Sequence, residues 1–223
     1  MRKKDYDPSI LHRMNLATIL PRTQHVDVLG SFYRVIRNAY SNHSQVRDHE
    51  ILDQELLLYG SPIDSILYVE GEQAMEKAKT ARTQEIRSKA ASCCISSLDT
   101  MESLLDNNQR LRWRHFSDVK TNLASSFYWS LQSRKNFVEY TVGRGWKALF
   151  CRTEADVAIA TDYKAGDVVL SGDSDYFGYM SIERLWRSVS NGPILDYRVP
   201  PLLQQLGLTR SQLTGLAVDS KND

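Results

Sequence analysis

The sequence is poor in cysteine and has no long apolar segment. Its 223 residues include three cysteines, of which Cys93 and Cys94 are adjacent. No two of them have the C-x-x-C spacing of a zinc site, and three cysteines form no disulfide framework, so we expect a reducing compartment. No run approaches the roughly 18 apolar residues of a membrane span. The basic N-terminus has no apolar region ahead of a cleavage site, so we expect a chain that is neither secreted nor membrane-bound.

Common catalytic motifs are also missing. The five histidines show no H-x-x-x-H spacing, and no serine stands in a G-x-S-x-G context. The G-R-G at 143–145 is too short for a phosphate-binding loop. We therefore expect neither a protein nucleophile nor a small-molecule cofactor.

The composition is that of an ordinary globular domain, with 42% apolar and 25% charged residues and a net charge of +1. Two stretches are nevertheless basic. Residues 76–90 and 109–120 each contain four or five Lys or Arg residues against one or two acids. Solvated helix faces account for such stretches in most proteins, and phosphate binding is the alternative.

Strand-like and helix-like segments alternate along the chain. The expected strands are 25–30, 62–71, 145–152 and 167–175, and the expected helices are 31–40, 72–90, 153–166, 181–189 and most of 92–140. Nearer the end, Thr209 and Gln212 form a capping box, and Pro200 and Pro201 open a shorter helix. This alternation predicts an α/β fold with a mostly parallel sheet, in which functional groups gather at the carboxyl ends of the strands.

Acidic residues stand at or just beyond the ends of all four expected strands. They are Asp27, Glu70, Glu154, Asp156, Asp173 and Asp175. Six carboxylates at one sheet edge repel one another unless divalent cations bind there, and oxygen ligands suit magnesium or manganese. Two such ions about 4 Å apart would clamp the attacking and leaving oxygens of a phosphodiester. Local roles are the alternative, because acids favour a first helical turn and aspartates form turns.

Several segments resemble motifs of a nuclease family. E-A-D at 154–156, followed by a strand and D-S-D at 173–175, resembles the internal motif of the flap endonuclease/XPG family in the PIN-like superfamily. The stretch LLQQLGLTRSQL (202–213) resembles the family's helix before a terminal aspartate. VDVLGSFYRVIRNA (26–39) resembles its first strand and helix, and ILYVEGEQAMEK (66–77) resembles its VFDG…K motif. The resemblance covers roughly 25–90 and 145–223.

The resemblance implies a PIN-like, flap-endonuclease-like three-layer α/β fold, with a central, mostly parallel twisted sheet flanked by helices and a helical insert. It implies an N-terminal extension at 1–24 and a nuclease domain at 25–223, in which 91–144 forms an arch over the active site. The family's duplex-binding region is expected to be absent or truncated. The run RLRWRHF (110–116) suits the arch, with Trp113 or Phe116 stacking on bases. The equal alternative is that both aromatics pack in the core.

The resemblance also implies an activity and a site. The expected enzyme is a Mg²⁺-dependent, structure-specific nuclease of the flap type with a two-metal mechanism, acting on DNA more than RNA, in DNA repair, in the nucleus or otherwise the cytoplasm. The expected ligands of two Mg²⁺ (or Mn²⁺) ions are Asp27, Glu70, Glu154, Asp156, Asp173, Asp175 and Asp223, with Asp219 the weaker candidate for the last position. The catalytic set is the first six of these with Lys77. The expected nucleic-acid contacts are Tyr33, Lys77, Arg82, Arg87, Arg112 and Arg114.

Two other functions stay open. An inactive PIN-like scaffold that binds RNA or protein is favoured by Glu70, where the family has aspartate, and by the end of the chain at Asp223. Gln84 also replaces a basic residue of the family pattern, although Arg82 or Arg87 can substitute for it. The set of mutually repelling acids argues against a scaffold. A response-regulator-like or phosphatase-like domain would instead depend on a single essential aspartate.

Overall fold

The computed structural model describes residues 22–40, 45–71, 78–152, 154–188 and 194–219. Two predicted site residues, Lys77 and Asp223, lie outside these ranges. The described strands form one six-stranded sheet. Its order is β3 (Lys147–Phe150), β2 (Ser65–Val69), β1 (Gln24–Asp27), β4 (Val168–Leu170), β5 (Arg184–Ser188) and β6 (Ile194–Arg198). All neighbours pair in parallel except β5 and β6, which are antiparallel.

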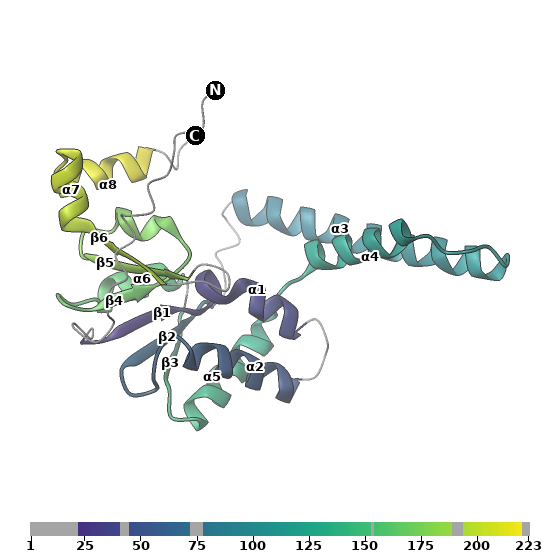
Figure 1. Ribbon diagram of the computed structural model, residues 1–223, viewed down its shortest axis with the longest axis horizontal. Helices are drawn as coiled ribbons and strands as arrows, with labels where there is room; N and C mark the ends of the chain where they lie inside the picture. The colour runs from purple at the N-terminus through teal and green to yellow at the C-terminus, as the bar shows by residue number, and fades with distance from the viewer. Residues whose placement is uncertain (1–21, 41–44, 72–77, 153, 189–193, 220–223) are drawn as a thin grey trace.

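Helices cover both faces of this sheet (Figure 1). One face packs against α1 (Val28–Tyr40), α2 (Gln45–Leu57) and α5 (Leu131–Gly143) in the larger core cluster. The other face packs against α6 (Ala155–Asp162) and the short 3-10 helix η3 (Ser174–Gly178). Successive strand residues alternate between the two clusters, as the pleat requires. The predicted three-layer α/β fold is therefore confirmed.

A long helical hairpin projects from this body. It consists of α3 (Ala78–Asp106) and α4 (Trp113–Ser126), which extend away from the sheet in Figure 1. The helices pack on each other through Ala90 and Cys94, each 8% exposed. The expectation that 92–140 is mostly helical is thus confirmed. The third helix of this region, α5, returns to the sheet, where Phe137 is fully buried.

Two helices, α7 (Val199–Leu206) and α8 (Arg210–Asp219), close the described chain. The predicted capping box is present, since the Thr209 backbone N–H donates to Gln212 Oε1 at 2.8 Å and the Gln212 N–H donates to Thr209 Oγ1 at 3.3 Å. Proline occupies the first turn of α7, as predicted. α8 packs against η3, where a Cβ on Gly178 would lie 2.9 Å from Ala217 Cβ.

Some predicted elements are wrong. Residues 181–189 are predicted to be helical, but 184–188 form β5, which pairs with β4 and β6 and buries Leu185 and Trp186 on opposite faces of the sheet. The first strand ends at Asp27, and α1 starts at Val28 instead of residue 31. No element is predicted from the sequence for the residues of α2 and β6. None of the described helices is long and apolar enough to cross a membrane.

Candidate active site

The strand order brings the six predicted acids to one edge of the sheet. β3, β2, β1 and β4 are adjacent and parallel, so their carboxyl ends point the same way. Asp27 ends β1, and Glu70 follows β2. The others lie in the connections after β3 and β4. We call this set the carboxylate edge: Asp27, Glu70, Glu154, Asp156, Asp173 and Asp175.

Asp27 is the buried centre of this edge, with 8% of its surface exposed. Its Oδ1 accepts the Gly30 N–H at 2.9 Å, while Oδ2 accepts the hydroxyls of Ser171 at 2.9 Å and Tyr176 at 3.2 Å. Burial raises the pKa of Asp27 above 3.8, and these three hydrogen bonds oppose the shift without cancelling it. The negative charge of Asp173 raises the pKa of Asp27 further.

Glycines let the backbone approach Asp27 closely. A Cβ on Gly30 would collide with the Asp27 carboxylate, and a Cβ on Gly172 would lie 2.7 Å from Gly30 O. The Gly172 N–H donates to that same carbonyl at 3.3 Å, which joins the start of α1 to the loop after β4. A side chain at position 30 would therefore displace the Asp27 carboxylate, and one at position 172 would push the loop after β4 away from Gly30.

The D-S-D turn is ordered by its own hydrogen bonds. The Asp173 N–H donates to Ser171 Oγ at 3.0 Å, and Asp173 Oδ1 accepts the Asp175 N–H at 2.9 Å, as the N-cap of η3. Ser171 thus connects this turn to Asp27, because its hydroxyl donates to Asp27 Oδ2. The turn-forming role considered for these aspartates holds for Asp173, whose charge acts on Asp27 at the end of β1, while the charge of Asp175 acts on Tyr179.

Glu154 and Asp156 lie at the start of α6, where Glu154 is the N-cap residue. The Tyr179 hydroxyl donates to Asp156 Oδ2 at 2.7 Å, and Asp156 Oδ1 accepts the Val157 N–H at 2.8 Å. Burial raises the pKa of Tyr179 well above its ordinary value of 10.0, and the bonded Asp156 carboxylate raises it further. Tyr179 therefore stays protonated and acts as a donor.

Glu70 is positioned by a buried arginine. Arg134, 5% exposed, donates through Nη1 to the carbonyls of Glu70 at 3.1 Å and Gly71 at 2.9 Å, and this nitrogen lies 4.0 Å from Glu70 Oε2. Behind these residues lies the buried Cys151, whose pKa rises to about 11 through burial and then through nearby carboxylates, Asp27 first among them. The Cys151 thiol is therefore protonated and unreactive at neutral pH.

The predicted nucleic-acid residues separate into two groups. Tyr33 lies on α1 and is 38% exposed, with its ring edge-on to Phe127 at 6.2 Å between centroids. Arg82 is exposed in α3, and the Arg87 guanidinium lies 5.3 Å from the centroid of the Tyr128 ring. These three residues lie near the base of the hairpin. Arg112 and Arg114 lie at its far end, so the structure does not bring them to the other three.

The carboxylate edge suits a hard divalent cation by its chemistry. All six donors are carboxylate oxygens, and their charges raise the pKa values of neighbouring groups such as Cys151, Tyr176 and Tyr179. Within the described ranges, no three His, Cys, Asp or Glu side chains stand together as a ready-made ion cage. The edge thus has oxygen ligands of the kind that suits Mg²⁺, while the carboxylates of Asp27, Asp156 and Asp173 accept hydrogen bonds from hydroxyls or backbone N–H groups.

Four positioning residues were missed by the sequence reasoning. They are Arg134, Ser171, Tyr176 and Tyr179. Ser171 precedes the D-S-D turn, and the two tyrosines stand one and four residues after Asp175, so their proximity in sequence was an available signal. Arg134 lies 64 residues from Glu70, and only the return of α5 to the sheet brings them together.

Comparisons with known proteins bear on the fold. No family model and no curated protein matches the sequence. Among solved structures, the chain is similar to human GEN1, crystallised in complex with Holliday junction DNA, with a TM-score of 0.51 and 15% identity. The match covers 88% of this chain and 44% of the GEN1 chain, so this chain spans less than half the length of its neighbour. At this identity the likeness establishes the fold alone, namely the three-layer α/β arrangement around a mostly parallel sheet that this chain shares with GEN1.

Proposed function

We propose that the chain is a metal-dependent nuclease of the flap endonuclease class that hydrolyses phosphodiester bonds in DNA. The observation that carries this proposal is the convergence of acids from four adjacent parallel strands on one edge, in a fold shared with a protein solved on DNA. A structural role explains one or two acids at strand ends. It gives no reason for acids from four adjacent strands to gather at one edge, around a buried Asp27 whose pKa is raised.

The carboxylate edge would hold the cations. When bound, two Mg²⁺ ions supply an activated water and stabilise the leaving oxygen of the phosphodiester. The chain's own residues keep the acids in place: Ser171 and Tyr176 hold Asp27, Tyr179 holds Asp156, and Arg134 holds the backbone at Glu70. Such outer hydrogen bonds orient the ligands of metal sites.

The substrate would reach the edge beside the hairpin base. Tyr33 follows Asp27 by six residues and presents an exposed ring for base stacking. Arg82 and Arg87 supply positive charge from α3, and Lys77 would polarise the scissile phosphate. DNA as the preferred substrate, DNA repair as the setting and the nucleus as the location are part of the proposal.

A second candidate is the non-catalytic scaffold. It is favoured by one observation, namely that oxygens of Asp27 and Asp156 are already satisfied by hydrogen bonds within the chain. A scaffold of this kind would keep its acids for turns and helix caps alone and would bind no divalent cation.

A cleavage assay separates the two. A labelled 5′-flap DNA is incubated with Mg²⁺ and wild type, with Asp173→Asn/Asp175→Asn, or with the control Asp118→Asn, which changes an exposed acid on α4. We expect cleavage by wild type and the control, and loss of activity on the order of 10³-fold in the double variant. Equal cleavage by the double variant, or none by folded wild type on flap, nicked or single-stranded DNA, would contradict the proposal.

A further inference from the structure

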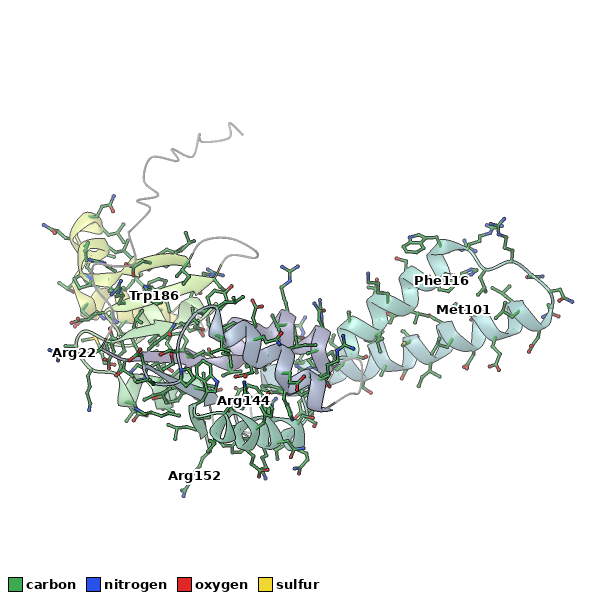
Figure 2. All side chains as sticks on the ribbon, turned by 60° about the horizontal axis from the view of Figure 1, so that its bottom comes forward. Arg22, Met101, Phe116, Arg144, Arg152 and Trp186 are labelled. Carbon is green, nitrogen blue, oxygen red and sulfur yellow. The ribbon has the colours of Figure 1, made fainter. Side chains whose placement is uncertain are left out.

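Two regions of the molecule lie outside the carboxylate edge, at opposite ends in Figure 2. One is the hairpin, where Phe116 is 48% and Trp113 is 81% exposed, so the core packing considered for these aromatics is wrong. The other is α8, which packs on η3 where Gly178 meets Ala217. α8 therefore contacts the segment that follows the D-S-D turn, and its first residue, Arg210, reaches further along that segment.

The guanidinium of Arg210 binds the turn formed by residues 179–182. Its Nη2 donates to the carbonyl oxygens of Tyr179 and, at 2.9 Å, of Ile182. Its Nε donates to Met180 O at 3.3 Å. The turn is also closed by the Ile182 N–H, which donates to Tyr179 O at 3.2 Å. Because the N–H groups of a guanidinium have a fixed planar arrangement, three carbonyls bound to one such group are held in a fixed arrangement too.

The same turn is bonded to α6 near both ends of that helix. The Tyr179 hydroxyl donates to Asp156 Oδ2 at 2.7 Å, in the first turn of α6. The Ser181 hydroxyl donates to Ala160 O at 2.9 Å, in the second half of α6. Ile182 is fully buried and fixes the end of the turn in the core. The shape of the turn therefore determines where the Tyr179 hydroxyl meets Asp156.

A simpler role for Arg210 is to attach α8 to the body of the molecule. Two observations indicate more than an attachment. The three carbonyls that Arg210 binds all belong to the turn that carries Tyr179. In addition, Arg210 Nη1 is buried and has no hydrogen-bond partner within the described ranges. A buried N–H group without a partner costs free energy, so the bonds to the turn are what stabilise the guanidinium in this position.

We propose that Arg210 is a positioning residue for the metal site, which holds the 179–182 turn so that Tyr179 keeps Asp156 in place. This inference rests on the proposed function, because it assigns Arg210 a role in binding the cations of the carboxylate edge. Hydrogen bonds that orient the ligands of a metal are known to affect metal affinity strongly. A change in the position of α8 would therefore reach the edge through Arg210, the turn and Tyr179.

A double-mutant cycle tests whether Arg210 acts through Tyr179. Mn²⁺ binding is measured by calorimetry for the full wild-type chain, Arg210→Ala, Tyr179→Phe and the double variant. We expect each single variant to weaken Mn²⁺ binding about tenfold. The double variant should also be about tenfold weaker, whereas independent effects would multiply to about a hundredfold. Arg210→Lys keeps the charge and one donor group, so its effect should be smaller than that of Arg210→Ala.

Arg184→Ala is the control for a general loss of stability. It removes two hydrogen bonds to Asp196, at 2.8 and 3.1 Å, between β5 and β6. Mn²⁺ affinity should be unchanged in this variant, although urea unfolding should show that it is destabilised, as Arg210→Ala is.

Fluorine NMR of the metal-free chain follows Tyr179 itself. The tyrosines are replaced by 3-fluorotyrosine, and the resonance that is missing in Tyr179→Phe identifies Tyr179. We expect this resonance to shift or broaden in Arg210→Ala and to stay in place in Arg184→Ala. A merely structural role of Arg210 would not move the Tyr179 resonance selectively. If Arg210→Ala does not fold, the same resonance and the Mn²⁺ affinity are measured in Arg210→Lys, where wild-type values for both would overturn the inference.

The inference and the proposed function fail in different ways. If wild type binds Mn²⁺ and Arg210→Ala binds it equally, or if the double variant is about a hundredfold weaker, the role of Arg210 through Tyr179 is overturned and the proposed function stands. An unmoved Tyr179 resonance in Arg210→Ala also overturns the inference, whatever the metal affinity. If the folded wild-type chain binds no Mn²⁺, the proposed function and the role of Arg210 at a metal site are both overturned.

Discussion

The carboxylate edge and the far end of the α3–α4 hairpin (residues 109–116, the hairpin tip) are built in opposite ways. At the edge, Asp27 is buried, three donors fix it, and glycine backbone packs against it. At the tip, Trp113 and the arginines are exposed, and two helices alone support them. The carboxylate edge therefore forms only when its four strands pair in the sheet, whereas the hairpin tip depends only on α3 and α4. Substitutions at the edge should alter chemistry and stability together, whereas those at the tip should leave the stability of the fold nearly unchanged.

The largest effect is expected at Asp27. Asp27→Asn should reduce the cleavage rate on the order of 10³-fold. The same change removes a carboxylate whose ionisation is disfavoured in the fold, so the unfolding free energy of the metal-free variant should depend less on pH than that of wild type. The reason is that burial raises the pKa of Asp27 in the fold above 3.8, so ionisation is more costly in the folded chain than in the unfolded chain. Urea unfolding and flap cleavage measure the two effects.

The pH dependence gives the sign of this effect. Between pH 3.8 and the raised pKa, the folded chain holds more protons than the unfolded chain, so the unfolding free energy falls as pH rises through that window. This fall in the unfolding free energy should be smaller in Asp27→Asn, which has no carboxyl group to titrate at this position. An equal fall in wild type and variant, with a normal urea slope in both, would contradict the assignment.

Gly30 should show the next largest effect. Gly30→Ala places a methyl group against the Asp27 carboxylate, so we expect a loss of about 1–3 kcal/mol and of cleavage. Gly215→Ala on α8 is the matched control, because its Cβ would meet no atom within 4 Å. That change should stabilise the chain by about 0.5–1 kcal/mol. Similar effects of the two substitutions on stability would show that the absence of a side chain at Gly30 is not required for its contact with Asp27.

Tyr179 should have a smaller effect that is specific to the metal. Tyr179→Phe removes the donor to Asp156 Oδ2, so Mn²⁺ affinity measured by calorimetry should fall about tenfold. Tyr163→Phe removes a hydroxyl that donates to Asp167 O at 2.8 Å, away from the edge. Both variants should lose about 1 kcal/mol of stability. If Tyr163→Phe weakens the metal equally, Tyr179 has no positioning role.

The smallest effect is expected at the tip. Trp113→Ala should change the unfolding free energy by less than about 0.5 kcal/mol, because the indole is exposed. Trp146→Ala is the contrast, since it leaves Asp53 without an indole donor at 2.7 Å and should cost about 3–5 kcal/mol. Thermal melts of both variants measure the difference. A clear loss of stability in Trp113→Ala would mean that the tip is part of the core.

The acids of the carboxylate edge could be predicted from the sequence, but the side chains that hold these acids in place could not. Acids at the ends of successive strands need only the alternation of strands and helices to be placed together, and that alternation was readable. The hydroxyl groups of Tyr176 and Tyr179, which donate to Asp27 and Asp156, could not be predicted. Their positions depend on the 3-10 helix η3, for which the sequence analysis found no pattern. The helix predicted at 181–189 is wrong for a similar reason, because pairing with β4 and β6 sets the extended conformation of residues 184–188.

Manganese EPR tests the central claim most directly, since it counts ions at the carboxylate edge without needing a substrate. Mn²⁺ is titrated into the full wild-type chain and into Asp173→Asn/Asp175→Asn, with Asp118→Asn as the control. The account predicts two bound ions per chain with a spin-coupled signal in wild type and control, and loss of that signal in the double variant. A folded wild-type chain that binds no Mn²⁺, or a double variant that binds it equally, would contradict the account.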